Sequence, residues 1–320
     1  MASTQAPSTT GQVVPAEPGT PQGSGVDREF TVTARSQRQQ ILRRLFRNKV
    51  GMSGLVLFGL ILAFGFIGPL VYGVDYAVQD VNSQSVPPGT DGYVLGSDAI
   101  GRDLLAGLMQ GVQRTLFIVL IFVVIALPLG LLVGALAGYF GRWVDSTLMR
   151  LVDLILTVPL FVVLIVVASN FPESRTPLGV GIILGLFGWL DLARIVRGQF
   201  LSLREKEYVE AAHALGASDK RIIFKHLIPN ALGSIIVWVT LAAAAAIGLE
   251  AALTYLGFGV NQANATSLGR LVSDGVQAAS TRPWLFYFPG ITLLLIVLAI
   301  NLIGDGIRDA FDPSHRRVRA

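Results

Sequence analysis

The sequence predicts an all-α integral membrane protein with six transmembrane helices and both termini in the cytoplasm. Of its 320 residues, 52% are hydrophobic and only 14% are charged, and the mean hydropathy is +0.61. An ordinary soluble domain is less apolar than this. The apolar residues gather in long uninterrupted runs, and the basic residues flank them on one side. These three observations together place the chain in the membrane.

Six apolar runs approach or exceed the roughly 20 residues that a helix needs to cross a hydrocarbon layer. An outer-membrane barrel would instead show segments of about ten residues that alternate between polar and apolar. A run such as LFIVLIFVVIALPLGLLVGALAG does not alternate, which favours helices. The predicted spans are Val50 to Val74, Leu116 to Gly138, Leu151 to Ala168, Leu178 to Val196, Ala231 to Phe258, and Trp284 to Ile303.

The placement of Lys and Arg predicts the orientation, because basic loops resist translocation. Twenty of these residues lie before the first span or in the segments after the second, fourth and sixth spans. The opposite side holds only five, which are Arg102, Arg114, Arg175, Arg270 and Arg282. Both termini are therefore predicted to be cytoplasmic. The pI near 9.6 follows from this topology and suits anionic lipid headgroups, so we expect no nucleic-acid partner.

The segments outside the spans divide the chain further. A Ser-, Thr-, Pro- and Gly-rich beginning predicts a disordered cytoplasmic tail, without the form of a secretory signal. The stretch SQRQQILRRLFRNKV, with Ser36 as a helix cap, fits either an amphipathic helix on the inner surface or a basic flank of the first span. The predicted divisions are a tail (1–37), an interfacial helix (38–49), the first span (50–74), an external segment (75–115), a core of the remaining five spans (116–303) with a cytoplasmic loop (197–230), and a C-terminal tail (304–320).

Several functions are excluded by residues that the chain lacks. It has no cysteine, so thiol chemistry and disulfides are absent. None of its four lysines follows glycine, so no phosphate-binding loop is encoded. The three histidines fall in predicted cytoplasmic segments, which argues against an intramembrane metal site. We therefore expect no cofactor, metal site or catalytic residue in this chain.

Three acidic residues lie near or within the spans, where burying a charge is costly. Asp153 and Asp191 are expected near the cytoplasmic ends, where headgroups or the arginines three residues away, Arg150 and Arg194, can satisfy them. Glu250 lies well inside the fifth span, beyond a poly-Ala stretch. It fits either a proton site of a secondary carrier or a hydrogen bond to a neighbouring helix.

The loop between the fourth and fifth spans carries the sequence EYVEAAHALGASDKRIIFKHLIPN. Glu205 to Leu215 is predicted to be a short helix that Gly216 ends in a left-handed conformation. Ser218 can cap a second helix that runs to about Ile228, before Pro229. This compact unit fits either a polar helical linker or a surface that another protein grips.

The spacing within that loop resembles the EAA signature of ATP-binding-cassette importer permeases. Glu210-Ala211-Ala212 is followed by Gly216 and then by His226-Leu227-Ile228-Pro229. In that family the loop carries a coupling helix that docks into a separate ATPase subunit. The resemblance implies that the coupling residues are Glu207, Glu210, Ala211, Ala212, Gly216 and Pro229.

Further motifs resemble the peptide and nickel importers, specifically their C-type permease subunit. LGSDAIGRDLLAGLMQG is similar to the family's external motif, through Asp98, Gly101, Arg102 and Asp103. It departs from that motif at Ala106-Gly107 and at Gln113. DSTLMRLVDLILTVP, EAALTYLGFGV and the final GDGIRDAFDP are also similar. The resemblance runs from about Ser36 to Pro313.

The resemblance implies a peptide importer of the bacterial plasma membrane, in which this chain forms half of the pathway. Its partners would be a second homologous permease, two ATPase subunits that bind ATP and Mg, and an external solute-binding protein. A proton-coupled carrier that uses Glu250 and a structural membrane scaffold remain the alternatives. ATP-dependent uptake would separate the first from the second.

Overall fold

A computed structural model describes residues 46–90, 92–260 and 266–311, which lie within the contact unit Gln37–Ala320. Three sequence predictions fall wholly or largely outside the described residues. They are the disordered tail 1–37, most of the interfacial helix 38–49 with its cap Ser36, and the end of the C-terminal tail, 312–320.

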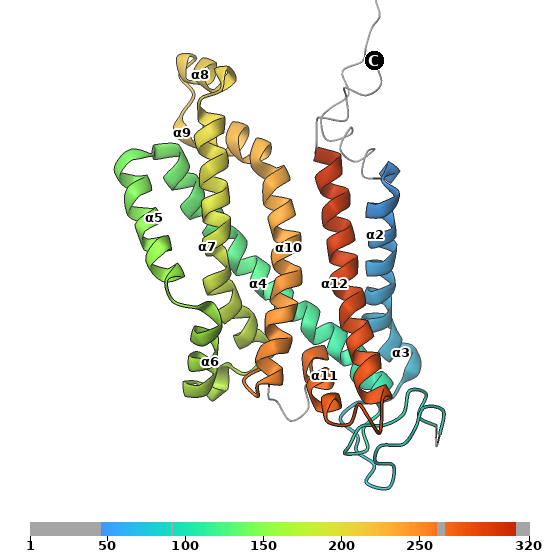
Figure 1. Cartoon of the computed structure of the whole chain (residues 1–320). Helices are drawn as coiled ribbons and strands as arrows, with labels where there is room; N and C mark the ends of the chain where they lie inside the picture. The colour runs from blue at the N-terminus through green and yellow to red at the C-terminus, as the bar shows by residue number, and fades with distance from the viewer. Residues whose placement is uncertain (1–45, 91, 261–265, 312–320) are drawn as a thin grey trace, which may run out of the picture. The chain divides into compact units, whose positions relative to one another are not determined.

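The described residues contain five helices long and apolar enough to cross a membrane, and six if one bent pair forms a single span. This agrees with the predicted helical membrane protein. The first of the five begins where the Asn48 side chain accepts hydrogen bonds from the N–H groups of Val50 (2.9 Å) and Gly51 (3.2 Å). The five are α2–η1–α3 (Lys49–Leu62, Ala63–Ile67, Gly68–Tyr72), α4 (Leu104–Phe140), α7 (Pro177–Arg204), α9–η3–α10 (Asp219–Ile222, Ile223–Leu227, Ile228–Tyr255) and α12 (Trp284–Phe311) (Figure 1).

The predicted third span, 151–168, is not one straight helix. It consists of α5 (Arg142–Leu156) and α6 (Leu160–Asn170), which bend by 69° at the residues between them. Pro159 causes the break, because its ring carries no N–H and forces the preceding residue away from the helical conformation. The predicted third span therefore corresponds to a pair of helices that is broken at this proline.

Several spans extend well beyond their predicted ends, among them the second and the sixth. Helix α4 begins at Leu104, inside the predicted external segment 75–115, because Asp103 caps it by accepting a hydrogen bond from the Ala106 N–H at 2.8 Å. Helix α12 continues past Ile303 to Phe311, so the first residues of the predicted tail 304–320 are helical. Apolar runs mark the lipid-buried part of a helix and do not mark its polar ends.

The sequence predicted that the second helix of the loop after α7 ends before Pro229. In the structure this helix continues through Pro229. Helix α9 passes through the π-helical turn η3 directly into α10. A π turn closes its hydrogen bonds one residue further along than an α turn, so the backbone can widen around a residue that has no N–H to donate. Pro229 then occupies the first turn of α10, where a missing N–H costs little.

The glycines of the final motif let α12 pack closely against two other helices. A Cβ built on Gly304 would overlap the Thr240 side chain of α10, and one built on Gly306 would overlap the backbone of Gly51 in α2. The small residues therefore let three helices approach closely. The motif that closes the chain serves helix packing in this structure.

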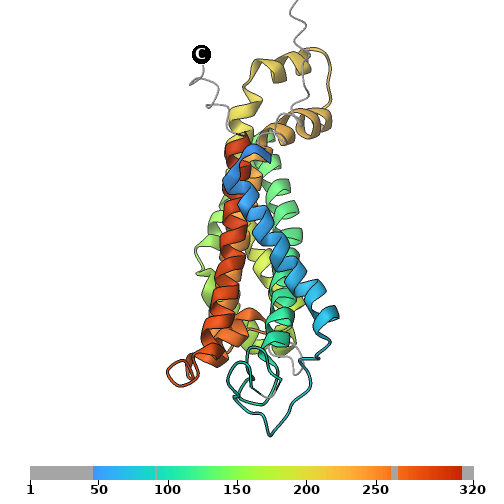
Figure 2. The ribbon, with the colours of Figure 1, turned by 90° about the vertical axis from the view of Figure 1, so that its right-hand side faces the viewer.

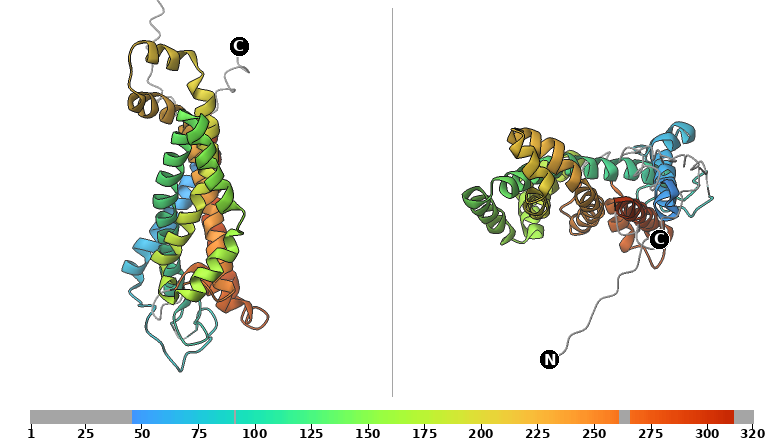
Figure 3. Two further views of the ribbon diagram at one scale, coloured as in Figure 1. Left: turned by 90° about the vertical axis from the view of Figure 1, so that its left-hand side faces the viewer. Right: turned by 90° about the horizontal axis from the view of Figure 1, so that it is seen from above.

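The two ends of the helix bundle differ. Helices α8 (Glu207–Ala214) and α9 project beyond the ends of α7 and α10, while the segment 73–103 and α11 (Leu268–Val276) lie at the opposite end (Figure 2). Viewed along the helices, α2 and α12 lie together on one side and α5 lies on the other (Figure 3). One core cluster joins α4, α6, α7 and α10, and a second joins α2, α4, α10, α11 and α12.

Candidate functional site

The helix–turn–helix formed by α8 and α9 is the most prominent feature at its end of the bundle (Figure 1). Its turn has the predicted geometry, since Gly216 has φ +78°. The N–H of Ala217 donates to the Ala212 carbonyl at 3.0 Å and that of Gly216 to the His213 carbonyl at 2.9 Å. Glycine adopts this left-handed backbone without the steric cost of a Cβ. Ser218 occupies the predicted cap position of α9, although its side chain forms no capping hydrogen bond.

Apolar side chains anchor this unit to the bundle. Val209 of α8 is 1% exposed, and Ile222 and Leu227 are completely buried beside Phe200 of α7. Burying such side chains stabilises by about 1.5–3 kcal/mol each. The unit is therefore part of the packed core and will not move independently of α7 and α10.

The residues of the EAA signature lie on the outer surface of this anchored unit. Glu207, Glu210, Ala211 and Gly216 are exposed, and Ala212 is half-buried against the core. Pro229 is also exposed, but it lies in the continuous α9–η3–α10 helix, away from the turn.

Two exposed apolar residues beside these positions were not identified from the sequence. Leu215 is 88% exposed directly before Gly216, and Phe224 is 70% exposed in the π turn. Contiguous exposed apolar patches mark surfaces that meet other proteins, whereas single exposed apolar side chains are common. The sequence signal was available, because both are large apolar residues within a polar loop.

A second set of contacts ties the helix–turn–helix to the end of α4. The Tyr139 hydroxyl donates a hydrogen bond to Asp219 Oδ1 at 2.6 Å, and the Tyr139 ring stacks on His213 with centroids 6.5 Å apart. The Arg204 guanidinium of α7 donates to the carbonyls of Gly138 and Tyr139 at 3.2 and 3.3 Å. The unit thus contacts three long helices, α4, α7 and α10. None of these contacts was predicted.

Ion pairs join α5 to α7 near this end. The Arg197 guanidinium forms a bidentate ion pair with Asp145, with N···O distances of 2.5 and 2.7 Å. Arg194 pairs with Asp153 at an N···O distance of 2.6 Å. The pairing of Arg194 with Asp191, which the sequence suggested, is not formed. Asp191 is exposed and has no hydrogen bond or ion pair within residues 46–90, 92–260 and 266–311.

At the opposite end, the four residues of the external motif come together in one turn. The Asp98 carboxylate accepts hydrogen bonds from the N–H groups of Ile100 (3.0 Å) and Arg102 (2.8 Å). Gly101 has φ +82°, and a Cβ there would lie 2.6 Å from the carbonyl carbon of Asp80. Burial raises the pKa of the Asp98 carboxyl above its ordinary value, although these backbone hydrogen bonds act in the opposite direction.

The other two motif residues contact aromatic side chains. Asp103 caps α4 and also accepts a hydrogen bond from the Tyr72 hydroxyl at 2.8 Å. The Arg102 guanidinium lies 5.1 Å from the centroid of the Tyr76 ring, a cation–π contact. Burial raises the pKa of the Tyr76 hydroxyl. The motif therefore shapes the external segment and positions the start of α4.

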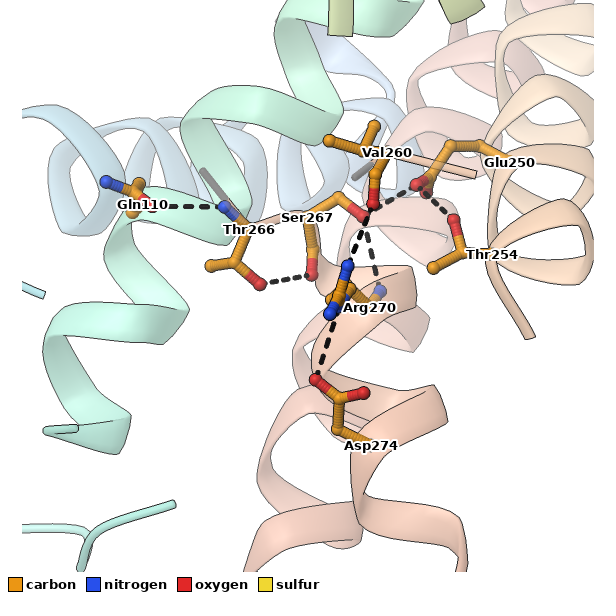
Figure 4. A network of polar contacts seen from close by, with 8 residues as sticks. All are labelled: Gln110, Glu250, Thr254, Val260, Thr266, Ser267, Arg270 and Asp274. Carbon is orange, nitrogen blue, oxygen red and sulfur yellow. Dashed lines mark hydrogen bonds and ion pairs between the residues drawn. The ribbon is translucent and has the colours of Figure 1, made fainter. Parts of the chain in front are cut away.

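Glu250 is 1% exposed and links α10 to α11 (Figure 4). Its Oε1 accepts hydrogen bonds from the hydroxyls of Ser267 (2.6 Å) and Thr254 (3.0 Å), while Oε2 has no hydrogen-bond partner among the described residues. The backbone of α11 approaches so closely that a Cβ on Gly269 would lie 2.8 Å from Oε2. Glu250 is thus hydrogen-bonded to a neighbouring helix, which was one of the two interpretations left open by the sequence.

The same network continues to α4 and to the loop after α10 (Figure 4). Gln110 of α4 accepts a hydrogen bond from the Thr266 N–H at 3.1 Å. Arg270 of α11 pairs with Asp274 at 3.4 Å and donates to the Val260 carbonyl at 3.3 Å. In the part of the chain that the structure describes, no three His, Asp or Glu side chains gather as metal ligands would.

Comparison with known proteins finds similarity along most of the chain. Residues 126–317 match the family described as binding-protein-dependent transport system inner membrane component, and residues 36–88 match the N-terminal TM domain of oligopeptide transport permease C. The oligopeptide transport system permease protein OppC of Mycobacterium tuberculosis (strain ATCC 25618 / H37Rv) is 40% identical over 284 residues, which cover 89% of this chain and 97% of that protein.

A second relative and one solved structure agree with this. The OppC protein of Haemophilus influenzae is 37% identical over 289 residues, covering 90% of this chain and 92% of that protein. An inward-facing structure of the MetNI methionine transporter, in its CY5 native crystal form, covers 65% of this chain and 96% of the compared chain. Its TM-score is 0.50 at 21% identity, which is a likeness of fold.

Proposed function

This chain belongs to the family of binding-protein-dependent transport system inner membrane components, and we propose that it forms half of an ATP-driven import pathway for oligopeptides. The cargo class follows the names of the relatives, which are oligopeptide permeases. The structural observation that carries the mechanism is the anchored helix–turn–helix, whose signature residues are exposed and whose apolar residues join the core.

In this proposal the helix–turn–helix is the coupling element. An ATPase subunit docks on the surface around Glu207, Glu210, Ala211 and Gly216, with Leu215 as an apolar anchor. When the ATPases close on ATP, the unit moves as a rigid body because its core residues are buried against α7 and α10. Helices α4, α7 and α10 then rock between inward-open and outward-open arrangements.

The partners are a second homologous permease, two ATPase subunits and an external solute-binding protein. ATP and Mg bind the ATPase subunits, where hydrolysis takes place, since this chain encodes no phosphate-binding loop. Differential affinity of ATP for the two arrangements supplies the work. The division of labour also explains why a transporter chain carries no nucleotide site.

We place the chain as a multi-pass protein in the bacterial plasma membrane, with the α8 end and both termini in the cytoplasm. The concentration of Lys and Arg in the segments at that end supports this orientation. The external motif around Asp98, Gly101, Arg102 and Asp103 then lies outside, where the solute-binding protein delivers cargo.

The test uses two glycines in the same conformation. Gly216 has φ +78° and Gly92 has φ +83°, and neither has any atom within 4 Å of an added Cβ. Gly216→Asp and Gly92→Asp therefore carry the same backbone strain at opposite ends of the bundle. Each tagged chain is purified in mild detergent from cells that express the whole gene cluster, and bound ATPase activity and peptide uptake are measured.

Loss of the ATPase and of uptake in Gly216→Asp alone is expected. The same bound ATPase activity and the same peptide uptake in the two variants would contradict the coupling role. Absence of any ATPase from the native chain, together with uptake that follows the proton gradient, would instead favour the carrier that uses Glu250.

A further inference from the structure

A shallow cavity of about 550 Å³, open to its surroundings over most of its surface, lies between α7, α10 and α12 toward the α8 end. Small-molecule sites have volumes of roughly 300–1,000 Å³, so the cavity can hold a short peptide. None of the signature residues lines it. Its walls are Ile195 from α7, then Asn230, Gly233, Ser234, Val237, Trp238 and Leu241 from α10, and Arg308 and Phe311 from α12.

The cavity wall has a polar part and an apolar part. Arg308 in the last turn of α12, the Ser234 hydroxyl and the Asn230 amide supply polar groups. Trp238 and Leu241 supply an apolar wall further along α10. Acyl chains offer no hydrogen bonds to a guanidinium or hydroxyl, so this combination fits a polar, partly apolar solute better than it fits acyl chains.

An acidic residue lies one helical turn from a residue of the cavity wall. Asp191 is four residues before Ile195, hence one turn away on the same face of α7, and its side chain is exposed. It has no ion pair within the described residues, because Arg194 pairs with Asp153. A carboxylate within an apolar helix of 28 residues is costly against lipid and needs water or a cation beside it.

From this juxtaposition we propose that the cavity is a binding site for short zwitterionic peptides. Arg308 holds the C-terminal carboxylate, Trp238 and Leu241 contact apolar side chains, and Asp191 attracts the N-terminal ammonium. A guanidinium suits a carboxylate because it can donate two parallel hydrogen bonds. The site rests on the proposed function and gives cargo a resting place in this subunit before release.

The absence of cysteine from the chain makes a direct test possible. Ser234→Cys places one nearly isosteric thiol on the cavity wall, and Ser202→Cys places a control thiol on exposed α7 surface outside it. In the complete reconstituted importer without nucleotide, the rate at which a water-soluble methanethiosulfonate modifies each thiol is measured. The measurement is repeated with trialanine or with N-acetyl-trialanine amide, which has neither the N-terminal ammonium nor the C-terminal carboxylate.

Trialanine at about ten times its Kd is expected to slow modification of Ser234→Cys about tenfold and to leave Ser202→Cys unaffected. The blocked peptide is expected to protect much less. Adding Arg308→Gln should remove the protection, and Arg308→Lys should restore part of it, since lysine keeps the charge.

Two results would overturn the site. One is a Ser234→Cys thiol that does not react, which would mean that lipid or the second permease fills the cavity. The other is a thiol that reacts at the same rate with and without peptide. ATP-driven uptake of trialanine by the same importer is measured in parallel, so failure of the cavity site can be distinguished from failure of the import function.

Discussion

Removal of one hydroxyl group tests whether Tyr139 carries movement from the helix–turn–helix into α4. Tyr139→Phe abolishes the 2.6 Å hydrogen bond to Asp219 and keeps the ring that stacks on His213. A hydrogen bond to a charged acceptor contributes about 1.5–3 kcal/mol, and solvent exposure lowers this one to about 1 kcal/mol. The equilibrium between the state in which the helix–turn–helix is attached to α4 and the state in which it is detached should therefore shift about fivefold toward detachment.

The assay is peptide uptake per ATP hydrolysed in the reconstituted importer. In Tyr139→Phe, hydrolysis is expected to continue while uptake per ATP falls by up to about fivefold, because part of the movement no longer reaches α4. Tyr287→Phe is the matched control, since Tyr287 lies in α12 and makes only a ring contact with Phe286 among the described residues.

A double-mutant cycle sharpens the test. If Tyr139 and Asp219 act through one hydrogen bond, Tyr139→Phe combined with Asp219→Asn should cost little more than either change alone. An unchanged ratio in Tyr139→Phe, or fully additive losses in the double variant, would refute the reasoning.

Three further changes probe other parts of the fold. Gly101→Ala should destabilise the external segment by at least about 1–2 kcal/mol from its left-handed backbone alone, lowering the melting temperature in detergent; a wild-type melting curve would contradict this. Arg197→Gln leaves the Asp145 carboxylate, whose side chain is 16% exposed, without its pair, and should cost about 1–3 kcal/mol in the same assay, whereas Asp145→Asn with Arg197→Gln should recover part of the loss. Glu250→Gln keeps an acceptor for Ser267 and should retain ATP-driven uptake, whereas loss of uptake with an intact complex would assign Glu250 a protonation role.

The sequence predicted the membrane class and the helical spans because apolar length is a strong signal. It also predicted the left-handed Gly216, since glycine after a short helix has a specific backbone meaning. It predicted a helix end at Pro229 from a local rule, but a π turn precedes this proline within a continuous helix. It made no prediction of the break at Pro159.

The contacts that tie the candidate site together were not predictable from one sequence. Tyr139 and Asp219 are 80 residues apart, and Asp145 and Arg197 are 52 apart. Pairing at such separations depends on how helices pack, which hydropathy does not report. The choice of Asp153 over Asp191 as the partner of Arg194 shows this directly, because sequence distance favoured Asp191.

The π turn η3 also has a geometrical consequence for the rest of its helix. It holds one residue more than an α-helical turn would, because each of its residues advances the side-chain direction by less than the roughly 100° of an α-helix. The extra residue is therefore absorbed within the turn. Deleting a single residue such as Phe224 would restore a regular α turn and remove an exposed apolar side chain, while Ser234, Val237 and Leu241 kept their direction toward the cavity that they line. One extra residue thus alters the surface at one end of this helix without rotating the wall that its next turns present.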